Sequence, residues 1–438
     1  MRCAGIVAEY NPFHRGHAYQ IAQTRAALGG EAAVVCAMSG HWVQQADCGV
    51  ADKWTRARLA LMGGADLVLE LPTPWATASA ERFARGGVEL LAATGVVDTL
   101  SFGSECGEIG PLAAAAACLD TEGYRDALRS RLSQGRPFAV CRQEAVEELM
   151  GKEIGGLLRR PNNNLGVEYL RALRRLGSSI APMTVLRRGA PHNSVGAAIV
   201  QHQDGTWESG PACMDLPQFA SATQIRLELL EGRWDLAEPY LVPGARSLLE
   251  NRLIGLPALQ RVERAMLARV RTMSAEDWAA LPDSGAAEGL PERLCRAGRQ
   301  ADSIQIFCRL AVTKRYTGAR IQRLLLWAFL GITAAEQPAG VPYLRVLGMN
   351  GRGKALLREM RGRADLPVIT KPAHVKALSE TGRRLFELEG RCTDLYGLCF
   401  EQPRPCGLEW TTGPVVLSIC FLDASSGTTP PYKVCRAI

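Results

Sequence analysis

Residues 8–17 read Ala8-Glu9-Tyr10-Asn11-Pro12-Phe13-His14-Arg15-Gly16-His17, between an apolar run typical of a buried strand and a segment with helical periodicity. Asn11-Pro12 favours a turn, and Gly16 lets a ligand approach the backbone. Two histidines three residues apart at a helix N-terminus can donate hydrogen bonds to phosphate oxygens, beside amides that the helix leaves unpaired. The stretch predicts a phosphate site, where His14 and His17 are candidate catalytic residues that stabilise the charge of leaving pyrophosphate.

Short apolar runs and helical patterns alternate outward from this stretch. The predicted strands are Cys3 to Ala8, Ala32 to Met38, Leu67 to Leu71, Thr99 to Phe102 and Ala181 to Leu186. The predicted helices between them include Gly16 to Leu28, Asp52 to Met62 and Ser79 to Ala93. Such alternation is typical of a parallel sheet covered on both faces. We therefore expect an α/β fold, a Rossmann-like doubly wound parallel sheet, with ligands beyond the carboxyl ends of its strands.

The second part of the chain has a different pattern. Residues 236–333 are mostly helical, with Pro and Gly breaks, and 438 residues exceed a comfortable single core. We expect a catalytic domain that carries the phosphate site over residues 1–232 and a mainly helical domain over residues 233–438.

Charge is divided unevenly between these parts. Residues 1–230 hold 22 lysines and arginines against 23 acidic residues, whereas residues 231–438 hold 29 against 21. The excess positive charge would attract a polyanion such as a nucleic acid to the second part, although charge that only maintains solubility is an equal alternative.

Composition is that of a folded globular protein, with 47% hydrophobic and 22% charged residues. No window holds the roughly 20 uninterrupted apolar residues of a membrane helix, so we expect a cytoplasmic protein without signal peptide or anchor. The fourteen cysteines are scattered and are predicted to be buried thiols. Cys392, Cys399 and Cys406 follow one another at seven-residue steps, which match no common zinc spacing, so we expect no metal site.

A second motif, Ser221-Ala222-Thr223-Gln224-Ile225-Arg226, opens another predicted helix. Two hydroxyls and an arginine at a helix N-terminus can bind phosphates together with the free amides, although Ser and Thr also commonly cap helices. The motif gains specificity only from its pairing with His14 and His17.

Together these motifs resemble the HxGH nucleotidyltransferase superfamily, which combines an HxGH loop after the first strand with an (I/S)SxTxIR element. Further segments resemble the tRNA(Met) cytidine acetate ligase family, and they span nearly the whole chain. They are residues 5–14, Met38-Ser39-Gly40, residues 66–72, Phe102-Gly103-Ser104-Glu105, Pro161-Asn162-Asn163, residues 165–169, residues 316–320 and residues 343–348.

This resemblance implies a two-step reaction. ATP, with Mg²⁺, and acetate give acetyl-adenylate, and the exocyclic amine of the wobble cytidine of elongator tRNA(Met) then takes the acetyl group. The implied ATP-binding residues come from the HxGH segment, three single positions and the second motif. They are Val7, Ala8, Glu9, Tyr10, Asn11, Pro12, Phe13, His14, Arg15, Gly16, His17, Ala18, Tyr19, Gln20, Gly103, Asn162, Arg187, Ser221, Thr223 and Arg226.

A basic segment in the second part is the candidate nucleic-acid site. Lys314, Arg315, Arg320 and Arg323 fall within ten residues, and Arg320 and Arg323 share one helix face. We predict contacts with tRNA phosphates and stacking of Tyr316 on a base; a structural helix with a basic rim is the alternative.

Some positions depart from the family pattern. The family usually has Gln-Arg-Gly where this chain has Gln44-Gln45-Ala46, so an arginine is absent, and His41 is either its substitute or irrelevant to the site. Pro191-His192-Asn193 replaces a Tyr-His-Asp, which weakens any role carried over to His192. Lys53 and Arg56 are either extra positive charge for the site or a solvated helix face.

Two other functions stay open at this point. One is an adenylyltransferase that acts on a small metabolite, which the length of the basic second part disfavours. The other is a non-catalytic, nucleotide-dependent RNA-binding protein, which the intact His14, His17 and Arg226 disfavour. The sequence does not indicate an oligomeric state.

Overall fold

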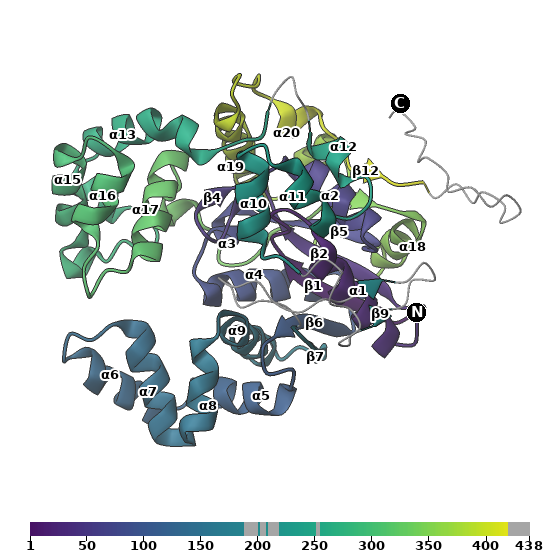
Figure 1. The fold of residues 1–438 in the computed structure, drawn as a ribbon, viewed down its shortest axis with the longest axis horizontal. Helices are drawn as coiled ribbons and strands as arrows, with labels where there is room; N and C mark the ends of the chain where they lie inside the picture. Colours follow the sequence, from purple (N-terminus) through teal and green to yellow (C-terminus); the bar gives the residue numbers. More distant parts are fainter. Residues whose placement is uncertain (188–199, 202–206, 209–218, 251–254, 419–438) are drawn as a thin grey trace, which may run out of the picture.

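The computed structural model describes residues 1–187, 200–201, 207–208, 219–250 and 255–418. A single eight-stranded sheet lies at its centre, with the order β11-β10-β5-β2-β1-β6-β7 and with β12 paired to β10 (Figure 1). Its strands are β1 (Cys3–Ala8), β2 (Ala33–Ser39), β5 (Leu67–Leu71), β6 (Thr99–Ser104), β7 (Ala181–Leu186), β10 (Leu344–Met349), β11 (Val368–Ile369) and β12 (Val415–Val416). Two hairpins, β3 (Trp42–Val43) with β4 (Asp47–Cys48) and β8 (Val200–Gln201) with β9 (Trp207–Glu208), lie outside it.

The predicted α/β fold is confirmed, with one difference in strand direction. Strands β5, β2, β1, β6 and β7 are mutually parallel, as expected. Strand β10, which we did not predict, runs antiparallel to β5 and enters the sheet from the second part of the chain. All six of its residues are buried, including Arg345, so it shows neither a polar alternation nor the unbroken apolar run that marked β2. The second part therefore completes the sheet of the first.

Helices cover both faces of the sheet, as the doubly wound arrangement requires. Val34 and Cys36 of β2 face a core built with α1 (Arg15–Ala27), α2 (Lys53–Met62), α10 (Ala222–Leu230) and α12 (Ala245–Leu249). Val35 and Ala37 face the opposite core, built with α4 (Ala80–Ala92) and α9 (Pro161–Leu176). Alternate side chains of one strand thus face the two opposite layers of helices.

Two groups of helices project from the sheet, both on the left in Figure 1. The first comprises α5 (Ile109–Cys118), α6 (Glu122–Leu132), α7 (Phe138–Met150) and α8 (Lys152–Gly156). The second, here called the helical module, comprises α13 (Glu263–Thr272), α14 (Ala275–Ala279), α15 (Leu290–Gln300), α16 (Ile304–Ala311) and α17 (Gly318–Leu330). Trp327 Nε1 donates to Thr77 Oγ1 at 2.8 Å, which anchors this module beside α3 (Thr73–Ala76).

The remaining helices carry the chain back to the sheet. They are α11 (Trp234–Ala237), α18 (Gly351–Met360), α19 (Glu380–Tyr396) and α20 (Leu408–Thr411). Helix α19 supports the β3–β4 hairpin, because Trp42 Nε1 donates to Cys392 O at 3.0 Å and Tyr396 Oη donates to Gly49 O at 2.9 Å.

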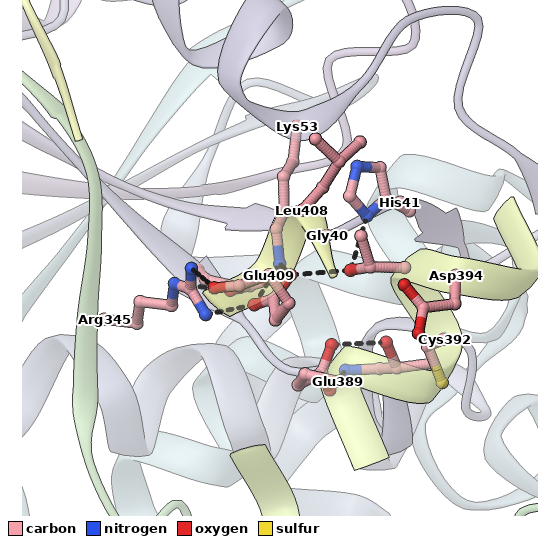
Figure 2. Close-up of polar contacts among 12 residues, drawn as sticks. Gly40, His41, Lys53, Arg345, Glu389, Cys392, Asp394, Leu408 and Glu409 are labelled. Atoms are coloured by element: carbon pink, nitrogen blue, oxygen red, sulfur yellow. Dashed lines mark hydrogen bonds and ion pairs between the residues drawn. The ribbon is translucent and has the colours of Figure 1, made fainter. Parts of the chain in front are cut away.

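A buried charge cluster joins α2, the sheet and the C-terminal helices (Figure 2). Lys53 Nζ lies 2.6 Å from Glu70 Oε1 and 2.8 Å from Glu409 Oε2, and Arg345 also pairs with Glu409. Thr393 Oγ1 donates to Glu409 at 2.6 Å. The Lys53 side chain is 0% exposed, so our alternative of a solvated helix face was wrong for this residue.

Glu389 lies in the same cluster and accepts hydrogen bonds from Thr73 N at 2.6 Å and Thr73 Oγ1 at 2.8 Å. Burial, followed by the negative charge of Glu70, raises its pKa from 4.5 to about 8. Between these pH values the unfolded chain therefore releases a proton that the native protein keeps. Because of this difference in bound protons, the free energy of unfolding falls as the pH rises from 4.5 to about 8.

Glu389→Gln should remove that pH dependence, since glutamine stays neutral and still bonds to Thr73. The change in slope is at most about 1.4 kcal/mol per pH unit. Urea unfolding of both proteins at several pH values in this window measures it, and equal slopes would mean that Glu389 is ionised in the native state.

Most of the described cysteines are buried free thiols, as predicted, although Cys406 is exposed. Within the described ranges, no cluster of three or more His, Cys, Asp or Glu residues has the geometry to hold a metal ion. No helix in those ranges is both long and apolar enough to cross a membrane.

Candidate nucleotide site

The HxGH loop connects β1 to α1 at the carboxyl edge of the parallel strands. His14 is the N-cap of α1, and its Nδ1 accepts from Gly16 N at 3.0 Å. His17 Nδ1 in turn accepts from His14 N at 3.2 Å, so the two histidines form a reciprocal capping box. Their rings stack, with centroids 3.8 Å apart. Gly16 is needed here because a Cβ atom would lie 2.8 Å from His14 Cε1.

The capping box fixes which ring nitrogens carry protons. Because both Nδ1 atoms accept hydrogen bonds, the neutral rings hold their protons on Nε2. Burial, then the charges of Arg187 and Arg226, lowers the pKa of His14 to about 3. Burial, then His14 and Arg187, lowers the pKa of His17 well below its usual range. The site therefore offers two neutral Nε2–H donors without paired protein acceptors in the described part of the chain.

Side chains of the loop divide between core and site. Tyr10 and Phe13 are buried and pack on each other and on the His17 ring, with centroids 4.7 to 5.5 Å apart. Tyr10 adopts a left-handed φ of 50°, while its hydroxyl lies 3.3 Å from Cys36 Sγ. Asn11 Oδ1 accepts from Val50 N at 2.7 Å. These contacts hold the loop rigid beneath the two histidines.

The second motif lies against this loop, as the pairing of the motifs predicted. Ser221 is the N-cap of α10 and accepts from Gln224 N at 3.1 Å. Arg226 Nη1 donates to Asn11 O at 2.7 Å, and its Nη2 lies 3.2 Å from Thr223 Oγ1. Residues 215 positions apart thus bring a guanidinium and a helix N-terminus to the histidines.

Gly103, Asn162 and Arg187 lie on the other side of β1. Arg187 follows β7 and donates from its backbone N to Ser104 O at 2.9 Å, while a Cβ atom on Gly103 would lie 3.2 Å from Arg187 Cγ. Asn162, in the first turn of α9, donates through Nδ2 to Glu105 Oε1 at 2.7 Å. Glu105, to which we gave no role, orients Asn162 and lies within electrostatic range of Arg187.

The β3–β4 hairpin carries two residues that depart from the family pattern, Gln45 and Ala46. Gln45 Oε1 accepts from Arg226 Nη2 at 3.4 Å, so a neutral acceptor stands where the family arginine would bring a second positive charge. Ala46 has a φ of 58°, a conformation that favours glycine. His41 is buried and stacks on Tyr396, with centroids 4.3 Å apart, so it does not replace that arginine in the site.

Arg56 is buried as well, so it is neither a solvated surface residue nor a free charge in the site. It donates only to backbone carbonyls, including Glu9 O at 2.6 Å. Neither alternative that we stated for Lys53 and Arg56 was right, because a sequence does not show which polar groups a buried helix face meets. His192 lies outside the described residues.

The candidate nucleic-acid residues lie on the helical module, apart from the HxGH loop (Figure 1). Lys314 and Arg315 are exposed, with Arg315 Nε 3.9 Å from Glu288 Oε2, and the less exposed Arg320 and Arg323 pair with Asp283 at 3.4 and 3.3 Å. Leu324, Leu325 and Trp327 are buried, as predicted. Tyr316 is also buried, and its hydroxyl donates to Glu288 O at 2.5 Å, so the prediction that it stacks on a base was wrong.

The fold and this site define a class of protein. A doubly wound sheet with an HxGH loop, closed by a helix that carries Ser221, Thr223 and Arg226, is the arrangement of the HxGH nucleotidyltransferases. The family model described as HIGH Nucleotidyl Transferase matches residues 1–407. Within this class, the chain belongs to the tRNA(Met) cytidine acetate ligase family, as the resemblance predicted.

Several relatives support this membership. The tRNA(Met) cytidine acetate ligase of Thermoanaerobacter sp. (strain X514) is 33% identical over 94% of this chain and 98% of its own length. That of Caldanaerobacter subterraneus subsp. tengcongensis is 36% identical over 92% of this chain and 96% of its own. Crystal structures of Thermotoga maritima TmcAL, 29% identical, cover 95% of this chain and all of theirs, with TM-scores of 0.83 bound to alpha-thio ATP and 0.85 without ligand.

Proposed function

We propose that this protein is an ATP-dependent ligase that activates acetate as acetyl-adenylate and transfers the acetyl group to the exocyclic amine of the wobble cytidine of elongator tRNA(Met). The observation that carries the proposal is the bond between Arg226 and Asn11, which joins the two phosphate-binding motifs in one site. Its relatives of nearly equal length are named for the same reaction.

The described residues fit the adenylation step. Acetate must attack the α-phosphorus of ATP in line with the leaving pyrophosphate, whose growing charge must be neutralised. We assign the Nε2–H groups of His14 and His17 to phosphate oxygens, together with the guanidinium of Arg226 and the free amides of α10. Arg187 supplies a further cation near His14. No covalent intermediate with the protein is needed.

We propose that the protein segment Val7–Gln20 surrounds the triphosphate of ATP and that Gly103 and Asn162 lie beside the nucleoside. It would enter as the Mg²⁺ complex, since Mg²⁺ is usually held by substrate phosphates and a few oxygen ligands. The neutral histidines suit this role, because they donate hydrogen bonds without repelling the metal ion. The tRNA substrate favours a cytoplasmic location.

The direct test is incubation with ATP, acetate and labelled pyrophosphate, followed by mass analysis of tRNA nucleosides. The ligase exchanges pyrophosphate into ATP only with acetate and then forms acetylcytidine. An adenylyltransferase for a small metabolite would show no dependence on acetate, and a non-catalytic RNA-binding protein would show no exchange at all.

We further propose that residues 1–232 carry the ATP chemistry and that the helical part of residues 233–438 binds tRNA. Lys314→Ala with Arg315→Ala should weaken tRNA binding and lower the salt slope by up to about two charge equivalents, because each phosphate contact releases counterions. Arg320→Ala with Arg323→Ala should have a smaller effect, since both arginines already pair with Asp283.

Dissociation constants over a range of salt concentrations measure both effects, and acetate-dependent exchange without tRNA is the control. Unchanged salt slopes in both double variants would mean that the basic segment does not contact tRNA. A collapse of exchange would mean that the helical module helps to build the ATP site.

A further inference from the structure

Arg56 occupies a position that the reaction itself does not explain. It lies on α2, is fully buried, and donates through Nε to Ala51 O at 3.0 Å, through Nη1 to Glu9 O at 2.6 Å and through Nη2 to Ser39 O at 3.1 Å and to Gly40 O. No carboxylate is among these partners. A buried cation bonded only to carbonyl oxygens must be held by geometry rather than by an ion pair.

Three of these four carbonyls, those of Glu9, Ser39 and Gly40, belong to the two loops that form the site. Glu9 follows β1 and begins the HxGH loop, whereas Ser39 and Gly40 end β2 and begin the β3–β4 segment. The loops also contact each other, because Gln44 N donates to Glu9 Oε1 at 2.6 Å. The guanidinium therefore bridges the carboxyl ends of two neighbouring parallel strands, which a planar group with several donors can do.

The helix that carries Arg56 is itself fixed by the buried charge cluster. Lys53 lies one turn earlier on the same face of α2 and pairs with Glu70 and Glu409. Figure 2 shows Lys53 beside Glu409. Helix α2 thus carries both Lys53, which pairs with Glu409 on α20, and Arg56, which bonds to the residue that precedes Tyr10.

We propose that Arg56 is a positioning residue, which sets the HxGH loop in the geometry that binds the triphosphate, without touching the substrate. This proposal rests on the proposed function, because it concerns the same site. Loss of the guanidinium would free Glu9 O and Gly40 O and let the loop relax. A misplacement of about 1 Å at a reacting centre can cost on the order of 10² in rate.

The chain offers a matched control at the opposite edge of the sheet. Arg25 donates to Ala32 O at 3.0 Å, Gly64 O at 2.9 Å and Asp66 Oδ2 at 2.6 Å, near the amino ends of β2 and β5. Arg25→Ala should therefore destabilise the protein without moving the loop. Both variants are compared per folded molecule, with the folded fraction taken from circular dichroism.

Arg56→Ala should lose on the order of 10² in the rate of acetate-dependent pyrophosphate exchange at saturating ATP. Added guanidinium, below concentrations that unfold the protein, should restore much of this rate by filling the cavity, and ammonium should not. Arg56→Lys should stay impaired, since one ammonium group cannot serve carbonyls on both loops. Arg25→Ala should keep the parental rate.

Normal exchange by folded Arg56→Ala would overturn the proposal, and so would an equal loss in Arg25→Ala that guanidinium does not relieve. Binding of alpha-thio ATP separates this proposal from the proposed function. If the parent shows no acetate-dependent exchange, the proposed function fails. Weaker binding of alpha-thio ATP by Arg56→Ala, but not by Arg25→Ala, then still supports the positioning role of Arg56. Unchanged binding of the analogue by Arg56→Ala rejects that role.

Discussion

Replacing His17 by alanine should lower the rate of acetate-dependent pyrophosphate exchange by about 10² or more, which is the loss seen when one preorganised donor is removed from a charge-stabilising site. The fold should survive, because the ring is only partly buried and packs at the edge of the Tyr10 and Phe13 cluster. Exchange rates and melting temperatures of the parent and the variant measure these two expectations.

Two further variants separate the roles of this histidine. His17→Asn keeps an oxygen that can accept from His14 N, so it preserves the helix cap but removes the Nε2–H donor. His374→Ala, an exposed histidine on η7 (Pro372–Ala377), is the matched control and should be fully active. Near-normal turnover of His17→Ala with normal melting would remove His17 from the mechanism, and full activity of His17→Asn would reduce its role to capping.

Glu409→Ala should lower the free energy of unfolding by about 3–5 kcal/mol, because it leaves Lys53 and Arg345 buried with only Glu70 to balance them. Glu409→Gln, which keeps the acceptor oxygen but not the charge, should lose less. Denaturant unfolding measures both, and the glutamine variant keeps the test possible if the alanine variant does not fold.

The control for this prediction is an exposed pair of the same type. Glu380 pairs with Arg384 one turn apart on α19, with 69% and 76% of the side chains exposed. Glu380→Ala should therefore cost at most about 0.5 kcal/mol. Similar losses of unfolding free energy in Glu380→Ala and Glu409→Ala would mean that burial does not increase the contribution of the charge cluster to stability.

The sequence predicted the parts of the fold whose signal is local. Apolar runs between helical patterns located β1, β2, β5, β6 and β7, and the HxGH loop was predicted at the junction where the structure has it. Strand β10 could not be predicted in this way. Strand β2 is also fully buried, but Arg345 interrupts the apolar run of β10, and its partner β5 lies about 275 residues earlier in the chain.

The candidate site shows the same limit. The two phosphate-binding motifs have spacings that imply their chemistry, and the structure brings them together through Arg226 and Asn11. Arg56 and Lys53 have no such signal, because their partners are backbone carbonyls and carboxylates supplied by distant segments. The prediction that Tyr316 stacks on a base failed for the same reason, since the burial of this residue depends on Glu288 and its neighbours in the helical module.

Completion of the sheet by β10 has a consequence for synthesis on the ribosome. When residues 1–232 have emerged, the edge of β5 is unpaired, and the Lys53–Glu70 pair lacks Arg345 and Glu409, which contact it in the finished protein. An open strand edge favours aggregation over folding. The edge of β5 therefore stays open until β10 at residues 344–349 has left the exit tunnel, so the sheet cannot close while only residues 1–232 are available.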